Sequence, residues 1–533
     1  MKRLLILSAV TLCMASLTGC NKGNKVDNTK AQLKIATFDG GVGDQWLKNA
    51  AEEFTKLNAE RTDFKEGKKG VQIHVFTNRG CSGTQLESSD LTEDIYFTEN
   101  VDYYKLTNLG KLADITDILT TSNANDGNRT ILSKIDTNLV NFMNRDGKYY
   151  AVPFYDCFYG LVYDKDLFNK YSFYMKNDGT FTNNKSEFGT GPNGVAGDWD
   201  DGLPRTYDEF YSMMDQMVGT NKVVPFTYSS GISTYYTSRA LTSYWSDFEG
   251  YEQTNLNYTF DGLAKNIVDT IDGDGNYTTK SVQISKNNGY ELRGQAGIYN
   301  ALKFARKITS QSQNYIAFDS NLDVQNAFVN KKHESGTKAK AIAMMFEGTW
   351  WENEAASAFE EARSYYSETS FNYGFMPIPK ADMGKLGDAT YMNLNDSFGF
   401  ISANSENMKL AKEFFAFLHS DEQMIKFTKT TNMTRGLQYN FSESDFESIT
   451  SYARDLVSIK NSEHAKVVYP YSSLDFVINN SAEFSTKSWP WKTNSYTDNP
   501  IIKFIDDKSL TAKTYFEDHL AALSQSAWNL IIS

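Results

Sequence analysis

Aromatic rings and carboxylates are the side chains of this chain that are best suited to bind a ligand. Phe, Trp and Tyr make up 14% of the 533 residues, and Asp and Glu together number 66. A flat ring can stack on the apolar C–H face of a pyranose, and a carboxylate accepts hydrogen bonds from hydroxyl groups. These residue types are therefore consistent with a sugar-binding cleft. The aromatic content also suits large hydrophobic cores, and composition alone does not separate the two interpretations.

Carboxylates also allow a catalytic interpretation. Glycoside hydrolysis strictly requires only a pair of carboxyl groups, and an acidic chain offers many such pairs. A secreted glycoside hydrolase therefore stays open as an alternative. The sequence lacks the G-x-S-x-G elbow of an esterase and the G-x-x-x-x-G-K-S/T loop that binds nucleotide phosphates.

The histidines and acidic loops do not predict an evident metal site. The five histidines lie far apart, and His333-Glu334 lacks the second histidine of a metalloprotease helix. An EF-hand loop that starts at Asp272 would need Gly and Glu where Tyr277 and Gln283 stand, so a β-hairpin turn is favoured there. A second acidic loop could hold calcium, although a solvated turn is favoured; it contains Asp198, Asp200 and Asp201.

Charge and length limit the class of protein. The formal net charge is −13 and no basic block is evident, which argues against nucleic acid as a partner. A length of 533 residues predicts two or more domains or two large lobes. A hydrophobic content of 40% is enough for sizeable cores.

The amino terminus has the pattern of an export signal. Lys2 and Arg3 precede an apolar run that is too short for a confident membrane span. We predict a secretory signal peptide over residues 1–19. The polar residues that follow predict an anchor and flexible tether over residues 20–32.

The end of this signal resembles the lipobox of bacterial lipoproteins, on the run Leu17-Thr18-Gly19-Cys20. The resemblance implies that Cys20 becomes the lipidated first residue and holds the protein on a membrane from outside. An ordinary signal peptide with a chance cysteine is the alternative. Outside the cell, Cys81 and Cys157 could form one disulfide, but two cysteines fix no framework.

The first elements after the tether predict a parallel sheet. Buried strands alternate with a helix whose apolar residues recur every 3.6 positions, and this order is typical of a βαβ unit. Ligands bind at the carboxyl ends of such strands, which places Asp39, the Arg79–Gly83 loop and the Thr98–Asn100 turn on a candidate rim. The predicted order is strand Leu33–Phe38, turn Asp39–Asp44, helix Trp46–Leu57, and strands Val71–Phe76 and Asp94–Phe97.

A later helix carries clear start and stop signals. Thr206 and Glu209 have the spacing of a capping box, in which each side chain bonds a backbone N–H of the first turn. The helix runs through Met217, and Gly219 is a plausible C-terminal stop. Residues 172–203 are rich in Gly, Asn, Asp and Thr, which predicts an inserted surface loop or hairpin.

Several segments together resemble the extracellular solute-binding proteins of carbohydrate ABC transporters, of the maltose-binding-protein type. The order and spacing of these segments across residues 33–420 carry the resemblance, whereas the region after 430 matches poorly. The first is similar to the family's first crossing between lobes, and the third to the strand and turn with a sugar-stacking tryptophan. The segments are Ala151–Tyr155 with Gly160–Phe168, Pro204–Phe210, Met344–Trp350, Tyr373–Pro379 and Phe398–Leu418.

This resemblance implies an α/β fold of the two-lobed periplasmic-binding-protein type with a ligand cleft between the lobes. The expected N-lobe comprises residues 31–155 and 377–425. The expected C-lobe comprises residues 156–376 and 426–533. Proteins of this kind close by a hinge around their ligand.

The resemblance also implies which residues contact the ligand. Trp350 stands at the position of the family's stacking tryptophan, while Trp351 is expected to face the core. Structural alternatives are a helix cap for Asp39, a cap or ion pair for Glu347, and a turn for Asp396. The expected contacts are Trp350, Asp39, Tyr155, Asp156, Tyr228, Ser230, Tyr235, Glu347 and Asp396.

The function implied is that of a lipid-anchored receptor on the extracellular or periplasmic side of the cell membrane. It would capture a carbohydrate, above all an oligosaccharide, and deliver it to the permease subunits of an ABC importer. Such a receptor is not an enzyme and needs no cofactor, and we expect a monomer. The two alternatives are the secreted glycoside hydrolase and a glycan-attachment surface lipoprotein.

Overall fold

The structure is a computed structural model that describes residues 26–533 except 79, 82, 230–234, 312–314, 319, 331–339, 367–370, 395–396, 481–483 and 485–499. The predicted signal peptide, Cys20, Ser230 and Asp396 lie outside the described residues, as does the side chain of Tyr235. No helix among the described residues combines the length and the hydropathy that a membrane crossing requires.

The first lobe is built on a five-stranded sheet with the order β2-β1-β3-β17-β6. β1 pairs in parallel with β2 and β3, while β17 is antiparallel to β3 and β6. The predicted βαβ unit is confirmed. The strands are β1 (Ala31–Thr37), β2 (Val71–Thr77), β3 (Ile95–Thr98), β6 (Val152–Pro153) and β17 (Phe398–Ile401).

Helices cover this sheet, and α1 (Gln45–Leu57) buries the apolar face that its 3.6-residue period predicts, with Trp46 and Phe54 in the core. α14 (Asp421–Thr431) packs beside α1, where Lys426 Nζ lies 2.8 Å from a carboxylate oxygen of Glu53. The boundary expected at residue 425 falls inside α14. The other helices are α2 (Gly83–Ser88), α3 (Tyr103–Asn108), α4 (Thr116–Thr120), α5 (Thr137–Met143) and α13 (Met408–Leu418), and a short ribbon pairs β4 (Ser122–Asn123) with β5 (Arg129–Thr130).

The second lobe repeats this plan with the sheet order β13-β10-β14-β7-β15. β10 pairs in parallel with β13 and β14, and β7 is antiparallel to β14 and β15. The strands are β7 (Tyr159–Asp164), β10 (Val223–Ser229), β13 (Tyr315–Phe318), β14 (Ala341–Gly348) and β15 (Tyr373–Met376), and the helices around them are α6 (Lys165–Tyr171), α7 (Tyr207–Gly219), α10 (Asn321–Val329), α11 (Trp351–Glu354), α12 (Ala356–Tyr366), α15 (Glu443–Glu447) and α16 (Ser451–Asn461).

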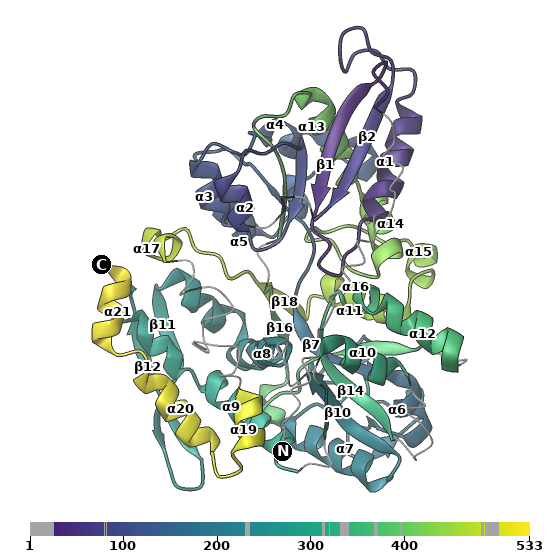
Figure 1. Cartoon of the computed structure of the whole chain (residues 1–533). Coiled ribbons are helices and arrows are strands. Elements are labelled where there is room, and N and C mark those ends of the chain that lie inside the picture. Colours follow the sequence, from purple (N-terminus) through teal and green to yellow (C-terminus); the bar gives the residue numbers. More distant parts are fainter. Residues whose placement is uncertain are drawn as a thin grey trace, which may run out of the picture.

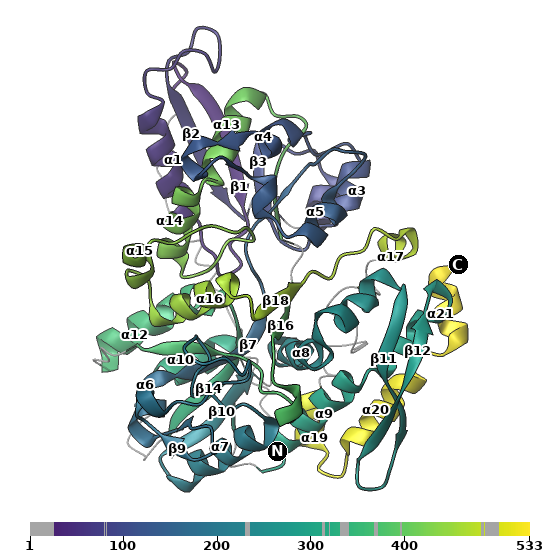
Figure 2. The ribbon, with the colours of Figure 1, turned by 180° about the vertical axis from the view of Figure 1, so that it is seen from behind.

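A mostly helical extension joins the second lobe and has its own core around Phe260 and Trp528. The predicted turn at Asp272 is confirmed as the tip of the β11–β12 hairpin, which lies against the last helices in both views (Figures 1 and 2). The extension contains α8 (Tyr235–Thr259), β11 (Gly262–Ile271), β12 (Tyr277–Ile284), α9 (Ala296–Ile308), α17 (Asp475–Asn479), α19 (Pro500–Asp506), α20 (Ala512–Ala521) and α21 (Gln525–Ile532).

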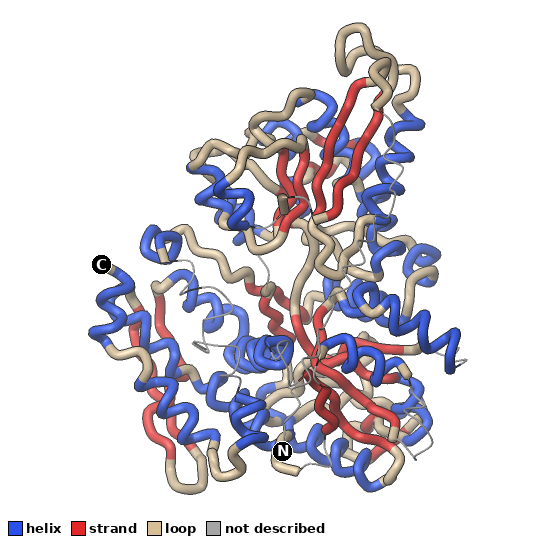
Figure 3. Tube along the Cα trace, in the orientation of Figure 1, coloured by secondary structure: helices blue, strands red, loops and turns tan. Residues whose placement is uncertain are grey.

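Three chain segments cross between the lobes and are hydrogen-bonded to one another. The first, residues 154–158, lies between the other two: Phe154 N donates to Ser397 O at 3.0 Å, and Asp156 N donates to Thr434 O at 3.0 Å. A parallel pair, β16 (Ala389–Met392) and β18 (Ala465–Val468), adds to this region. Figure 3 shows the two groups of strands on either side of it.

The first lobe also encloses the guanidinium of Arg435, which belongs to the third crossing (residues 431–451). Its side chain is fully buried among four aromatic rings, whose centroids lie 5.2–5.7 Å from the guanidinium carbon. His419 accepts the hydrogen bond of Arg435 Nη2 on Nε2 at 2.8 Å, since its Nδ1–H is directed to Phe415 O at 2.7 Å. A neutral His419 therefore completes the surroundings of a buried cation.

This arrangement makes the protein sensitive to acid. Burial, together with Arg435, holds the pKa of His419 well below its ordinary value of 6.5. The unfolded chain protonates this histidine below about pH 6.5 and the native chain does not, so stability is lost as pH falls. We predict that the free energy of unfolding of the His419→Gln variant, whose amide oxygen can accept from Arg435, falls less between pH 7 and pH 5. Chemical denaturation at each pH measures this free energy. An equal decrease in both proteins would contradict the prediction.

Candidate functional site

The carboxyl ends of the parallel strands from both sheets meet between the lobes. The register pairs Gly348, the last residue of β14, with Tyr159 at the start of β7, and pairs Thr98, at the end of β3, with Phe398. Tyr159 and Phe398 each adjoin a crossing segment, so both strand ends face the other lobe. Ligands bind at such strand ends in open α/β sheets.

The loop after β1 touches the second lobe at this place. Asn353 Nδ2 of α11 donates to Gly41 O at 2.5 Å. Gly41 has a φ of +87°, and a Cβ placed on it would lie 2.8 Å from Cδ1 of Trp350. Glycine is therefore required here for both its conformation and the close approach. A ligand that reaches Trp350 must move this loop away from the indole.

Trp350 lies at this interface with 4% of its surface exposed. The ring of Tyr159 stands at 83° to the indole with centroids 4.8 Å apart, and that of Tyr236 at 66° and 6.0 Å. By contrast, Trp351 is fully buried among four rings of the second-lobe core. The two adjacent tryptophans therefore occupy different environments.

Gly348 fixes the position of the Trp350 indole. A Cβ on Gly348 would lie 2.1 Å from Cη2 of that ring, so a methyl group there displaces the indole. We predict that Gly348→Ala weakens ligand binding about tenfold and lowers stability by about 1–3 kcal/mol, the usual cost of overpacking. Gly219→Ala is the matched control, because no atom lies within 4 Å of the Cβ position there. Calorimetric affinity equal to that of wild type in Gly348→Ala would refute the prediction.

The first crossing presents alternate residues to opposite sides, as an extended segment does. Tyr155 is 2% exposed and its hydroxyl donates to the carboxylate of Glu99, which follows β3. Gly40 lies against the same carboxylate, since a Cβ on it would be 2.6 Å from Glu99 Oε1. Glu99 belongs to the turn that sequence reasoning placed on the rim, but it was not singled out as a site residue.

Asp156 lies on the other side of this crossing. Its Oδ2 accepts from Lys460 Nζ at 2.8 Å and from Thr434 Oγ1 at 2.7 Å, and its carbonyl accepts from Thr349 Oγ1 at 2.7 Å. These bonds join the first crossing to the third. The structure therefore gives Asp156 structural contacts at the crossings.

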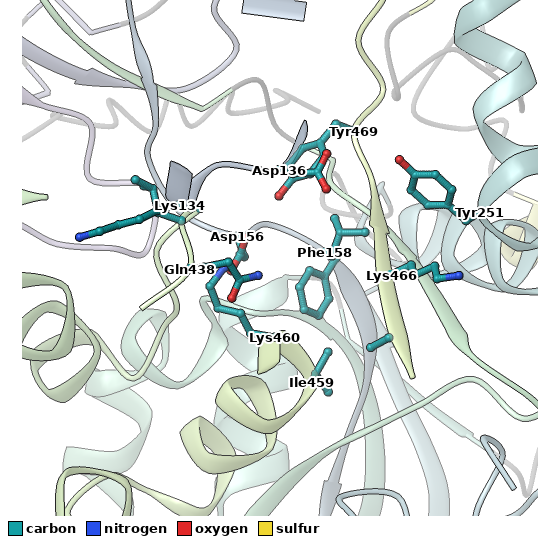
Figure 4. Close-up of a pocket in the computed structure, with 14 residues that line it drawn as sticks. Lys134, Asp136, Asp156, Phe158, Tyr251, Gln438, Ile459, Lys460, Lys466 and Tyr469 are labelled. Carbon is teal, nitrogen blue, oxygen red and sulfur yellow. The ribbon is translucent and has the colours of Figure 1, made fainter. Parts of the chain in front are cut away.

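Asp156 lines a cavity of about 310 Å³ between the lobes (Figure 4). First-lobe residues such as Asp136 form one wall, and second-lobe residues such as Phe158 form the other. The lining residues are Lys134, Asp136, Asp156, Phe158, Tyr251, Gly436, Leu437, Gln438, Ile459, Lys460, Ala465, Lys466, Val467 and Tyr469.

Glu347 belongs to a buried network beneath Trp350. Its carboxylate accepts from Asn321 Nδ2 at 2.9 Å, from Gln325 Nε2 at 3.0 Å and from Gly348 N at 2.8 Å. The amide of Gln325 also donates to Glu354 at 2.7 Å. Burial raises the pKa of Glu347, and the neighbouring Glu354 raises it further. These bonds hold both carboxyl groups in the second lobe.

The remaining expected residues differ in their surroundings. Asp39 closes its own turn, since its Oδ1 accepts from Gly43 N at 3.1 Å. Tyr228 is 3% exposed, and its buried hydroxyl has no hydrogen-bond partner among the described residues. Cys157 is buried and forms no disulfide with Cys81. Burial, reinforced by Glu99, raises the pKa of the Cys157 thiol, which keeps it protonated.

Comparisons with known proteins agree with this architecture. The sequence profile of a family described as bacterial extracellular solute-binding protein matches residues 43–425. No curated protein sequence matches the chain.

Solved structures of similar fold cover nearly the whole chain. Apo RafE from Streptococcus pneumoniae is 14% identical with a TM-score of 0.56, covering 96% of this chain and 100% of its own. RafE in complex with raffinose is 14% identical with a TM-score of 0.54, and the match covers 94% of this chain and 100% of that chain. The cyclic α-maltosyl-1,6-maltose binding protein from Arthrobacter globiformis is 14% identical with a TM-score of 0.53, and the match covers 94% of this chain and 99% of that chain. At such identities the likeness establishes the two-lobed α/β fold.

Proposed function

We propose that this chain, which belongs to the family of bacterial extracellular solute-binding proteins, captures a carbohydrate between its lobes for an ABC importer. The observation that carries the proposal is Trp350, an indole at the meeting point of strand ends from both lobes. An aromatic ring there provides the apolar platform on which a sugar ring stacks. Solved structures of similar fold bind raffinose and a cyclic maltosyl-maltose, which supports a carbohydrate as the ligand class.

The polar residues around Trp350 suit sugar hydroxyls. The loop after β1 lies between Glu99 and Trp350, since Gly40 is next to Glu99 and Gly41 is next to Trp350. Tyr155 donates to Glu99, and Tyr236 donates to Glu354 at 3.1 Å. Hydroxyl groups of a sugar can accept from phenols and donate to carboxylates, so these side chains can exchange their mutual bonds for bonds to a ligand. We propose Trp350, Tyr155, Glu99 and Tyr236 as the core of the site, with Asp39 and Tyr228 at its edges.

The capture step is a hinge motion of the two lobes. Separation of the lobes frees the loop after β1 from Trp350, and closure over a sugar buries it between Gly41 and the indole. The three crossing segments serve as the hinge; they are residues 154–158, the described residues of 376–397, and residues 431–451. We further propose that residues 1–19 are removed, that Cys20 is lipidated, and that the monomer delivers its ligand to permease subunits at the cell membrane.

A thermal-shift screen of residues 21–533 against mono- and oligosaccharides tests this function. Because a ligand of the native state raises the melting temperature by mass action, we expect a rise with one glycan class. A flat response to the whole panel would count against a carbohydrate ligand.

Sugar release from the same glycans tests the glycoside hydrolase alternative. Glu347 is buried and, with Glu354, accepts hydrogen bonds from the amide of Gln325, whereas the carboxyl groups of a glycosidase must reach a glycosidic bond. We expect binding without release of reducing sugar. Steady turnover would refute a role confined to binding.

A further inference from the structure

The segment before α7 folds into a compact acidic loop far from Trp350 in the sequence. It follows a short hairpin of β8 (Tyr174–Met175) and β9 (Phe181–Thr182), which confirms the loop or hairpin predicted for residues 172–203. The loop is tied to the segment before β16, where Gly387 N donates to Pro192 O at 3.2 Å. The loop is therefore joined to the middle of the second crossing.

Three carboxylates of this loop converge on one point. Asp198, Asp200 and Asp201 each offer one oxygen, and these oxygens lie within 4.8 Å of one another. Two oxygens bound to the same Ca²⁺ are at most about 4.6–5.2 Å apart, because each Ca–O bond is about 2.3–2.6 Å. The spacing therefore fits a shared calcium ion.

A separate observation is that two of these carboxylates, the buried Asp200 and the half-buried Asp201, each have an oxygen with no donor. Asp200 is fully buried; its Oδ2 accepts from Asn193 N at 3.0 Å, but its Oδ1 has no hydrogen-bond partner. Oδ1 of Asp201 is also buried without a partner. Burial of an ionised carboxylate without compensation is costly, so a positive charge is required at this point.

Two species can supply that charge, a proton or a metal ion. One proton neutralises one of three clustered charges and leaves the other two in repulsion. A divalent cation compensates two charges and gives both unpartnered oxygens a ligand bond.

We infer that Asp198, Asp200 and Asp201 bind one Ca²⁺ ion that fixes this loop in the second lobe. The ligand atoms are all oxygen, which suits a hard cation, and a loop with three carboxylates does not impose the strict octahedron that Mg²⁺ demands. Backbone carbonyls and water complete the six to eight ligands. The site is structural and does not depend on the proposed sugar site.

Calcium titration of residues 21–533 after chelator treatment tests this inference. We expect one Ca²⁺ per chain by calorimetry, a higher melting temperature with Ca²⁺, and at least tenfold weaker binding of Mg²⁺. Tb³⁺ should replace Ca²⁺ and give luminescence sensitised by Trp199, which lies between two of the ligands in the sequence.

Two variants and a control assign the response to this loop. Asp200→Asn and Asp201→Asn should each weaken Ca²⁺ and Tb³⁺ binding at least tenfold, while Asp274→Asn in the exposed β11–β12 turn should bind like wild type. If a proton neutralises the cluster instead, Asp200→Asn keeps or raises the melting temperature and wild type shows no calcium response. That result, or a calcium response retained in both variants, would overturn the inference.

Discussion

Replacement of Trp350 with alanine is expected to weaken carbohydrate binding at least tenfold while the protein still folds. The substitution removes the ring that a sugar would stack on. Loss of buried apolar surface costs about 25 cal/mol per Å², so the loss of about 60 Å² of contact exceeds the 1.4 kcal/mol of a tenfold change in affinity. Calorimetry with the glycan found by the thermal-shift screen measures this effect.

Trp351→Ala is the matched control for this variant. Trp351 is fully buried, packed against Phe328, Phe359, Tyr373 and Tyr452. Its truncation should lower the free energy of unfolding by about 3–5 kcal/mol and leave the affinity of the folded fraction within a few-fold of wild type. Wild-type affinity in Trp350→Ala would remove the principal residue of the proposed site.

A large loss of stability is also expected from Lys380→Met. Lys380 Nζ lies 2.8 and 2.9 Å from the two carboxylate oxygens of Asp247 and also donates to Asp388 O at 2.9 Å. The two side chains are 5% and 3% exposed. Removal of the ammonium leaves a buried carboxylate without its cation, which costs about 3–5 kcal/mol. Denaturant unfolding of the variant gives this value directly.

Two controls separate burial from charge in this prediction. Lys280→Met breaks a pair with Asp269 at 3.2 Å whose side chains are about half exposed, and should cost less than about 1 kcal/mol. Lys380→Met with Asp247→Asn should recover most of the loss, because the amide oxygen can still accept from Thr390 N, which lies 2.9 Å from Asp247 Oδ1. A single variant as stable as wild type would show that the buried pair does not stabilise the fold.

Local patterns in the sequence predicted the elements well, because hydrophobic period and capping chemistry act over a few residues. Thr206 does accept from Glu209 N, at 3.3 Å, and α7 ends at Gly219. The reciprocal half of the capping box differs: the Glu209 carboxylate accepts from Arg205 N at 2.7 Å and also pairs with the Arg205 guanidinium. An ion pair with the preceding residue outcompetes the bond to the cap residue.

The site could be predicted only in part, since its side chains come from distant segments. The hydrogen bond from Tyr155 to Glu99 joins residues that are 56 positions apart in the sequence, and no local pattern predicts that contact. The alternation of the first crossing sends Asp156 to the opposite side from Tyr155, where Lys460 holds it. The sequence therefore predicts a carboxylate in this segment, but the direction of its side chain depends on tertiary packing.

Hydrogen exchange with and without the bound glycan tests the central claim most directly. We expect sugar binding to slow exchange of backbone amides in both the loop 38–44 of the first lobe and residues 348–354 of the second, because closure orders both walls of the site. Protection in only one lobe, or protection confined to the cavity residues around Asp156 and Tyr469, would contradict capture between the lobes at Trp350.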